Sequence, residues 1–463
     1  MLLSNSKLQA QTLIVFAAAA AAQAAEHFSC KHSRDGSRLN KPTCPRHSRS
    51  VRDVYMCLGS QYFRRAYRMS YKSFWELYLK VKDEMEATFK EAAKIRRLAR
   101  RKHRRQLRRG NNRNPTPPPP PNGKIHTSVR LACALRYSAG GSPYDIISTY
   151  GISHTEQFDS VWYTVDAVNK TKEFDIKYPE SHEEQRKIAE DFRGVSTVKF
   201  ECCGGSIDGI LIWTLKPTLA NAKAVGVDQQ KFMCGRKHKF GLNCQAVSDV
   251  RGQFLDISIT YGGASSDVVT FESSDLKRHL DQGLLAPNLV LFGDNAYIDS
   301  QYMVTPYPNT SGGPKDNYNF FHSQLRIRIE CAFGMLVQRW GILRSAVPRN
   351  ISIAKTITLV LALAKLHNFC IDAADEVVAN PLLQDEHHMT TNESGSVPLV
   401  PNADASKVLG REVTTPDDLI GGGEHFDDAP RQYRRRQQDD YHRTGLCIHV
   451  QDSFMSRPRR RGT

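Results

Sequence analysis

The stretch Leu289-Val-Leu-Phe-Gly-Asp-Asn-Ala-Tyr297 joins a short apolar run to an acid. Consecutive apolar residues are typical of a buried strand, and the Gly-Asp-Asn sequence that follows is typical of a turn. The pattern predicts a strand that stops at Gly293 and carries the carboxylate of Asp294 at its tip. One acid at such a junction is common, so its meaning depends on the other acids of the chain.

Two further acids stand in comparable settings. Asp208 interrupts the apolar run Ser206-Ile-Asp-Gly-Ile-Leu-Ile-Trp213, where an unpaired carboxylate would be costly to bury. Glu330 lies in a helix expected over residues 321–340, and Arg326 lies four residues before it, so an ion pair explains it equally well. Taken singly, each acid is explained by a structural role. Together, acids from three separate elements predict a site for Mg²⁺ or Mn²⁺, because these hard cations prefer carboxylate oxygens and substrate phosphates.

The region around these acids has the element order of an α/β layer structure. Alternating apolar and polar residues predict a hairpin with strands over 239–249 and 254–261. Helices are expected over 271–280 and over 354–370, and the second is apolar almost all round, which predicts burial. His367, on that buried helix, is interpreted as a hydrogen-bonded core histidine rather than a catalytic base.

A small helical module is predicted over residues 124–178, before the α/β region. Ser142-Pro143 and Ser153 are typical of helix starts, and glycines separate the helices. Helix, turn and helix form the outline of a DNA-binding motif, although any antiparallel helix pair shares it. For a DNA-reading module, the side chains expected to face the groove are His154, Thr155, Gln157 and Ser160.

The charge of the chain favours an anionic partner. Its 463 residues carry a net charge of +16, and nucleic acid is the first candidate. The basic run Lys94–Arg109 fits a nuclear-localisation signal or a phosphate-contacting arm, with a solvated linker as the alternative. An Ala-rich run over residues 17–25 resembles part of a signal peptide, so secretion is the minor alternative to the nucleus. The eleven cysteines include no Cys-x-x-Cys pair and do not have the density of a disulfide scaffold.

Changes in composition divide the chain into five parts. They are a loose Ala-rich and basic leader (1–61), a helical segment with the basic run and a polyproline linker (62–123), the helical module (124–178), the α/β domain (198–372), and a mostly disordered tail with basic ends and one short helix near 428–441 (373–463).

Across residues 125–372 the chain resembles the PIF/Harbinger transposases and the nucleases derived from them. The motifs that carry the resemblance occur in the family's order and spacing. They are Ile207-Asp-Gly209, Phe240–Asp249 with Gly252–Asp256, Phe292–Tyr297 with Thr305-Pro-Tyr307, Phe320–Gly334, and Leu366-His-Asn-Phe369.

The resemblance implies an α/β fold with an RNase H-like DDE catalytic domain preceded by a small all-α helix-turn-helix module. Its implied catalytic residues are Asp208, Asp294 and Glu330, and Asp267 is implied as a further metal contact. The implied activity is cleavage, and in a transposase also transfer, of DNA strands with Mg²⁺ or Mn²⁺ by a two-metal mechanism. DNA and a Myb-like DNA-binding protein are the implied partners. A homodimer is a further candidate assembly, and no membrane partner is expected. We expect the phosphate contacts from Lys239, Arg326 and Arg328.

The sequence departs from the family pattern without losing a carboxylate. The departures are Ile210 for Thr, Ser266 for His, Asn295-Ala296 for Ser-Gly, and Val337-Gln338 for a basic residue. Changes around metal ligands alter metal affinity. The alternative function is therefore a domesticated DNA-binding protein that keeps the fold with weak or no catalysis. A secreted phosphodiesterase is a second alternative and depends on the Ala-rich run.

Overall fold

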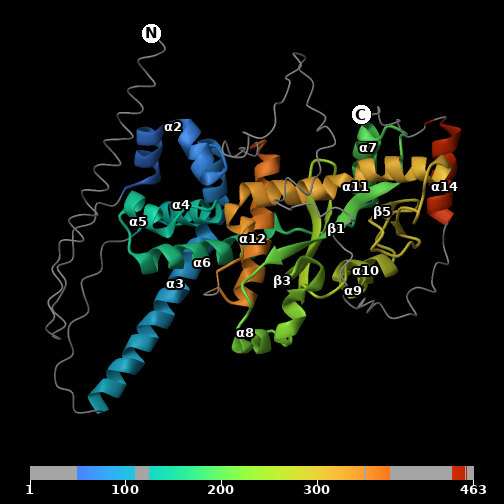
Figure 1. Cartoon of the computed structure of the whole chain (residues 1–463). Helices are drawn as coiled ribbons and strands as arrows, with labels where there is room; N and C mark the ends of the chain where they lie inside the picture. The colour runs from blue at the N-terminus through green and yellow to red at the C-terminus, as the bar shows by residue number, and fades with distance from the viewer. Residues whose placement is uncertain (1–48, 110–124, 349–350, 376–440, 454, 456–463) are drawn as a thin grey trace, which may run out of the picture.

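The computed structural model describes residues 49–109, 125–348, 351–375, 441–453 and 455 (Figure 1). The helices before the sheet are α2 (Val51–Tyr67), α3 (Tyr71–Arg109), α4 (Thr127–Ser138), α5 (Pro143–Tyr150), α6 (His154–Lys170) and α7 (His182–Val195). The strands are β1 (Cys203–Trp213), β2 (Met233–Cys234), β3 (Lys239–Ser248), β4 (Phe254–Gly262), β5 (Val290–Phe292) and β6 (Met303–Val304). The remaining helices are α8 (Leu219–Ala224), α9 (Asp267–Glu272), α10 (Asp275–Asp281), α11 (Gly313–Arg339), α12 (Ile353–Asp372) and α14 (Tyr441–Asp452).

The helices expected between residues 124 and 168 are present, and local signals set their ends. Pro143 begins α5, and Gly151 ends it with a φ of 64°, a conformation that glycine adopts without strain. The Ser153 side chain accepts a hydrogen bond from the Glu156 backbone and so caps α6. The boundaries of the module therefore follow from its caps.

Two N-terminal helices precede the predicted module, and the first of them begins earlier than composition predicts. α2 begins at Val51 and so crosses the predicted boundary between residues 61 and 62. The Ser70 side chain accepts a hydrogen bond from the Ser73 backbone at the start of α3, and that helix continues through the basic run to Arg109. Apolar residues of α2 and α3 belong to the same hydrophobic cluster as those of α4, α6 and α12. These N-terminal helices thus share one core with the predicted module.

The sheet is mixed, with six strands in the order β2-β3-β1-β5-β6 and with β4 paired to β3. β1, β3 and β4 pair antiparallel, and β3 and β4 form the predicted hairpin. β5 and β6 continue the sheet on the other side of β1 in parallel orientation. The parallel half requires a crossover connection, which residues 263–289 with α9 and α10 provide.

Side chains of β5 alternate between two apolar layers that cover the two faces of the sheet. Val290 and Phe292 belong to a cluster with residues of α7, α11 and α14. Leu291 belongs to a second cluster with residues of α9 and α10. Figure 1 shows α11 along one side of the sheet and α9 and α10 on the other. The sheet is therefore a central layer with helices on both faces.

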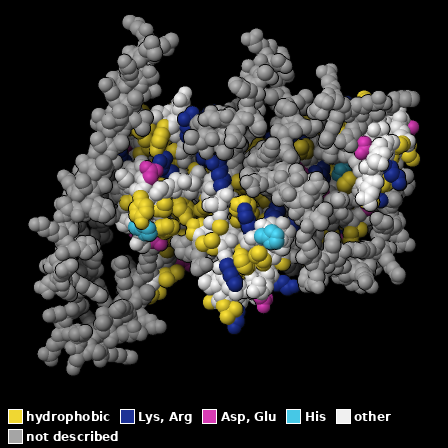
Figure 2. Space-filling model, viewed as in Figure 1, with side chains coloured by type: hydrophobic (Ala, Val, Ile, Leu, Met, Phe, Trp, Pro, Cys, Tyr) yellow, Lys and Arg dark blue, Asp and Glu magenta, His cyan; other side chains and the backbone are white. Residues whose placement is uncertain are grey.

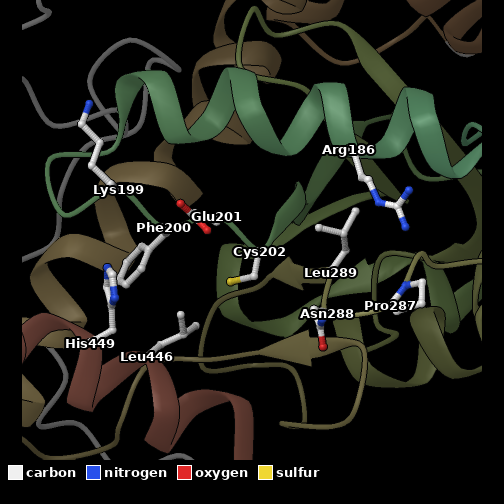
Figure 3. A pocket seen from close by; sticks show the side chains of 10 residues that line it. All are labelled: Arg186, Lys199, Phe200, Glu201, Cys202, Pro287, Asn288, Leu289, Leu446 and His449. Atoms are coloured by element: carbon white, nitrogen blue, oxygen red, sulfur yellow. The ribbon is translucent and has the colours of Figure 1, made fainter.

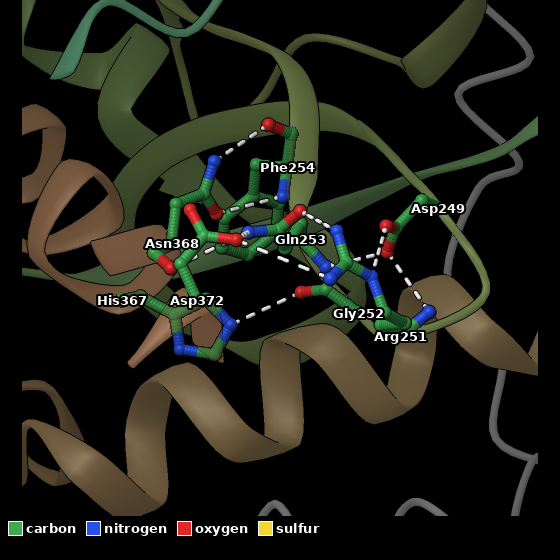
Figure 4. Close-up of polar contacts among 8 residues, drawn as sticks. All are labelled: Asp249, Arg251, Gly252, Gln253, Phe254, His367, Asn368 and Asp372. Atoms are coloured by element: carbon green, nitrogen blue, oxygen red, sulfur yellow. Dashed lines mark hydrogen bonds and ion pairs between the residues drawn. The ribbon is translucent and has the colours of Figure 1, made fainter. Parts of the chain in front are cut away.

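The turn of the β3–β4 hairpin is fixed to α12 by side-chain hydrogen bonds (Figure 4). Asn368 accepts a bond from the Phe254 backbone N–H (2.9 Å) and donates one to the Phe254 carbonyl (2.8 Å). His367 is fully buried and its Nε2 lies 3.0 Å from the Gly252 carbonyl oxygen. The interpretation of His367 as a core histidine is thus confirmed, and the Leu-His-Asn-Phe motif has a structural role here.

α12 is long and apolar enough to cross a membrane by length and composition, but 61% of its apolar window is buried inside the protein. The predicted burial of this helix is confirmed.

One described part of the predicted loose tail is ordered: α14 packs against α11. Val450 is fully buried and Cys447 nearly so, in the same cluster as Phe321 and Leu325 of α11. The helix predicted near 428–441 lies outside the described residues except for Tyr441. A cavity of about 370 Å³ lies between α7, the segment 199–202 before β1, residues 287–289 and α14, with Arg186, Lys199 and His449 among its lining residues (Figure 3).

Candidate active site

Asp208 and Asp294 are brought together by the register of two parallel strands. Ser206 of β1 pairs with Phe292 of β5, and each aspartate follows its strand's member of that pair by two residues. Neighbouring strands lie about 4.8 Å apart, so the two carboxylates are carried to adjacent points of one sheet edge. The predicted position of Asp294 at a strand tip is confirmed.

Glu330 reaches the same edge from α11. The Ser206 hydroxyl donates a 2.9 Å hydrogen bond to the Leu325 carbonyl, so α11 crosses directly over this part of β1. Arg326 forms an ion pair with Glu330, one helical turn later, and the same guanidinium nitrogen, Nη1, lies 3.8 Å from Asp208 Oδ2. A cationic side chain therefore lies between the helix acid and the strand acid.

Asp267 approaches the site from the other face of β1. It is the first residue of α9, and a Cβ atom placed on Gly209 would lie 2.4 Å from its Oδ1. A glycine after Asp208 is therefore needed for Asp267 to come this close. Asn243 Nδ2 donates a 3.1 Å hydrogen bond to Asp267 Oδ1. Asn243 is a member of the site that the sequence analysis missed.

The loop after β5 holds Asp294 with its backbone. The Ala296 N–H donates a 2.9 Å hydrogen bond to Asp294 Oδ1. Because a backbone group supplies this bond, the departure from Ser-Gly at residues 295 and 296 leaves the support in place. Gln245 Nε2 donates to the Tyr297 hydroxyl (2.8 Å) and to the Asp267 carbonyl (3.1 Å). Gln245 thus connects the β5 loop to the start of α9.

Burial and the charges of neighbouring acids raise the pKa values of two aspartates in the site. Burial, and next the charge of Asp294, raise the pKa of Asp208 to about 7. Burial is also the main cause that raises the pKa of Asp294, and the nearby Asp267 adds to it. Such shifts are typical of functional sites. The carboxylates gain stability from any cation that binds between them.

The donor atoms suit Mg²⁺ or Mn²⁺, since they are carboxylate oxygens supplemented by an amide oxygen. Asn243 is 7% exposed, and among the described residues its buried Oδ1 atom has no hydrogen-bond partner, which leaves one oxygen donor beside Asp267 unused. In the described part of the chain, no three His, Cys, Asp or Glu side chains are grouped so that they could hold a metal ion as they stand. The four-carboxylate metal site of Asp208, Asp267, Asp294 and Glu330 stays a prediction.

Two of the four residues predicted to face DNA in the helical module are buried, so that part of the prediction is wrong for this conformation. Gln157 and Ser160 are both 0% exposed. Ser160 Oγ accepts a 3.2 Å hydrogen bond from the buried Arg130, which also pairs with Glu156 at 2.9 Å. α6 lies against α3, α4 and α12, and these contacts bury its polar residues along with its apolar ones. His154 and Thr155, at the start of α6, are exposed as expected.

The three predicted phosphate contacts lie in different places. Arg326 is at the acids, whereas Arg328, two residues further along α11, points to another side of the helix. Lys239 lies over the Trp213 ring, 3.3 Å from its centroid. Asn243, the β3 residue that contacts Asp267, lies four residues further along the strand, roughly 13 Å from Lys239. The structure therefore does not bring Lys239 to the acids.

Arg236 is the cation that sequence reasoning overlooked. It is exposed and lies in the segment 214–238, which connects β1 to β3. Its charge lowers the pKa of Asp294, against the larger effect of burial. On the face shown in Figure 2, Lys and Arg side chains are spread over the middle of the molecule among hydrophobic ones, with few Asp or Glu. Cations near an acidic site suit a polyanionic substrate.

Comparison with known proteins gives one family match. Residues 207–368 match the family model described as DDE superfamily endonuclease, a range that includes Asp208, Asp267, Asp294 and Glu330. No curated protein matches the chain. No solved structure matches it either. The match supports the DDE endonuclease superfamily, a transposase-like class of nucleases, for this part of the chain.

Proposed function

We propose that this protein is a divalent-metal-dependent DNA endonuclease or transposase of the Harbinger type, built on an RNase H-like catalytic domain. The observation that carries the proposal is the matched placement of Asp208 and Asp294 on neighbouring parallel strands, with Glu330 on the helix that crosses them. The family match over residues 207–368 and the motifs of the sequence support the same reaction class.

Asp208, Asp294 and Glu330 would hold the metal, with Asp267 and the Asn243 amide oxygen as further donors. A bound Mg²⁺ or Mn²⁺ supplies an activated water and stabilises the charge that develops on the phosphate. The chain contributes rigid placement: the sheet fixes the two strand acids, and α11 fixes the third. Arg326 and Arg236 bring positive charge to the same edge, where they would hold the negatively charged DNA backbone.

The DNA-binding surface is proposed to include the basic end of α3 and the exposed start of α6 with His154 and Thr155. The net charge of +16 supports binding that weakens steeply with salt. A nuclear location and a Myb-like partner fit a DNA-cutting enzyme, and a homodimer fits one that acts on two DNA ends. Fluorescent tagging of the full chain tests the location, since a nuclear signal excludes secretion.

The test of the activity is Mn²⁺-dependent nicking of supercoiled plasmid DNA by the full-length protein and by the Asp294→Ala variant. Nicking by the wild type that the variant lacks, with unchanged circular dichroism, supports the proposal. Salt-dependent DNA binding without cleavage in Mn²⁺ or in Mg²⁺ would instead support the alternative function, a DNA-binding protein that keeps the fold without catalysis.

A further inference from the structure

Arg326 occupies the position between two acids that a metal ion would also need. Its Nη1 atom bonds to Glu330 Oε1 and lies 3.8 Å from Asp208 Oδ2. The side chains of Arg326, Asp208 and Glu330 are 21%, 19% and 25% exposed, so water screens their charges only partly. One nitrogen atom of Arg326 therefore lies close to carboxylates from two separate elements, β1 and α11.

The same oxygen atoms cannot be fully shared between a guanidinium group and a divalent cation. Mg²⁺ binds at about 2.1 Å from its oxygen ligands and requires near-ideal octahedral geometry. In this structure the Oε1 atom of Glu330 already accepts a hydrogen bond from the guanidinium group of Arg326. A metal held through Glu330 Oε1 and Asp208 Oδ2 thus requires the Arg326 side chain to leave at least one of these two atoms.

We propose that Arg326 is a built-in counter-ion that competes with the metal: it pairs with Asp208 and Glu330 in the metal-free protein and is displaced when a divalent cation binds. This inference rests on the proposed function, since it presumes that these acids bind metal. The displaced guanidinium group remains at the same sheet edge, where a DNA phosphate can pair with it. DNA and metal then favour the same displaced conformation, so each strengthens the binding of the other.

The chain offers a matched control for this competition. Arg328 lies on the same helix and carries the same charge, but points to another side of α11. Removing either charge changes the net charge of the protein equally. Only removal of Arg326 frees the two acids, so the two variants separate direct competition from a general electrostatic effect.

The experiment is titration of full-length protein with Mn²⁺ in the absence of DNA, followed by calorimetry or by the electron paramagnetic resonance signal of free Mn²⁺. Arg326→Gln is expected to tighten the Kd for Mn²⁺ at least tenfold, and Arg328→Gln to change it less than twofold. Circular dichroism monitors folding. If Arg326→Gln does not fold, Arg326→Lys, which keeps the charge but lacks the planar fork, is expected to tighten the Kd about threefold.

An unchanged or weaker Mn²⁺ affinity of the Arg326 variants overturns the inference, and so does equal tightening by Arg328→Gln. In both cases the wild type still binds Mn²⁺, so the proposed function stands. If neither the wild type nor the variants bind Mn²⁺ at millimolar concentration, the proposed function and the inference fail together.

Discussion

Asp208 on β1 and Asp294 just beyond the end of the parallel strand β5 stand at equivalent positions, each two residues after its own member of the Ser206–Phe292 pair. Their proximity is therefore a consequence of strand register rather than of flexible side-chain placement. A register fixed by the apolar faces of both strands also fixes the acids, because a slip of one residue would turn every side chain to the other face. The core and the site depend on the same pairing.

The stability of the metal-free protein is expected to fall with rising pH because of Asp208. Its pKa is raised from 3.8 to about 7 by burial and by Asp294, so the folded state holds a proton that the unfolded state has lost. Stability from this group is fully present below about pH 4 and is lost as pH rises through about 7. Asp208→Asn removes this loss, so in EDTA its Tm should exceed that of the wild type by more at pH 8 than at pH 5.

A carboxylate with the opposite shift provides the control. A hydrogen bond from Lys277 lowers the pKa of Asp281, so its charge is constant over this pH range. The Tm difference between Asp281→Asn and the wild type should be the same at pH 5 and pH 8. A Tm difference for Asp208→Asn that also stays flat between pH 5 and pH 8 would contradict the raised pKa of Asp208.

Arg236→Gln is expected to reduce plasmid nicking about tenfold, because it removes the exposed cation whose charge acts on Asp294. A lost phosphate contact should also lower the salt dependence of DNA binding, measured by fluorescence anisotropy at several salt concentrations. Lys223→Gln, on α8 of the same segment, is the charge-matched control. An equal loss of nicking in both variants would mean that the overall positive charge, rather than the position of Arg236, determines the rate.

Asn368→Ala is expected to destabilise the protein by roughly 2 kcal/mol, since it removes two hydrogen bonds to the Phe254 backbone. The measurement is urea denaturation, with the exposed Gln282→Ala as control. Metal affinity should change little, because Phe254 pairs with Ser248, five residues along β3 from Asn243. A large loss of Mn²⁺ binding with normal stability would assign this motif to the site instead.

Val450→Asp is expected to lower the Tm by several degrees or to release α14, because it places a charge in the cluster shared with α11. Gln451→Asp adds the same charge at an exposed neighbouring position and should leave the Tm unchanged. Hydrogen exchange of α14 separates release from global destabilisation. Normal stability and protection in Val450→Asp would show that α14 does not dock in solution.

Much of the fold and of the acid set could be predicted because the signals are local. Ser153, Pro143 and Gly151 determine helix ends within a few residues, and the apolar run before Gly293 determines β5. The placement of Asp208 on a strand, Asp294 at a strand tip and Glu330 on a helix followed from the same patterns.

The rest could not be predicted because it depends on contacts between distant segments. Gln157 and Ser160 have the residue types of exposed positions, and only packing beside Arg130 buries them. The approach of Asp267 depends on the absence of a side chain at Gly209, which no periodic pattern reveals. The docking of α14 involves few apolar residues and a long preceding segment, so composition alone predicted a loose tail.

The most direct test of the account compares nicking of supercoiled DNA with Mn²⁺ by the wild type, by Asp208→Asn, Asp294→Asn and Glu330→Gln, and by the control Asp281→Asn. Each active-site change keeps the side-chain shape and removes one charge, so a metal-dependent site should lose at least a hundredfold in rate while the control cleaves as the wild type does. Cleavage at the wild-type rate by any of the three variants would contradict the assignment of these acids as one catalytic set.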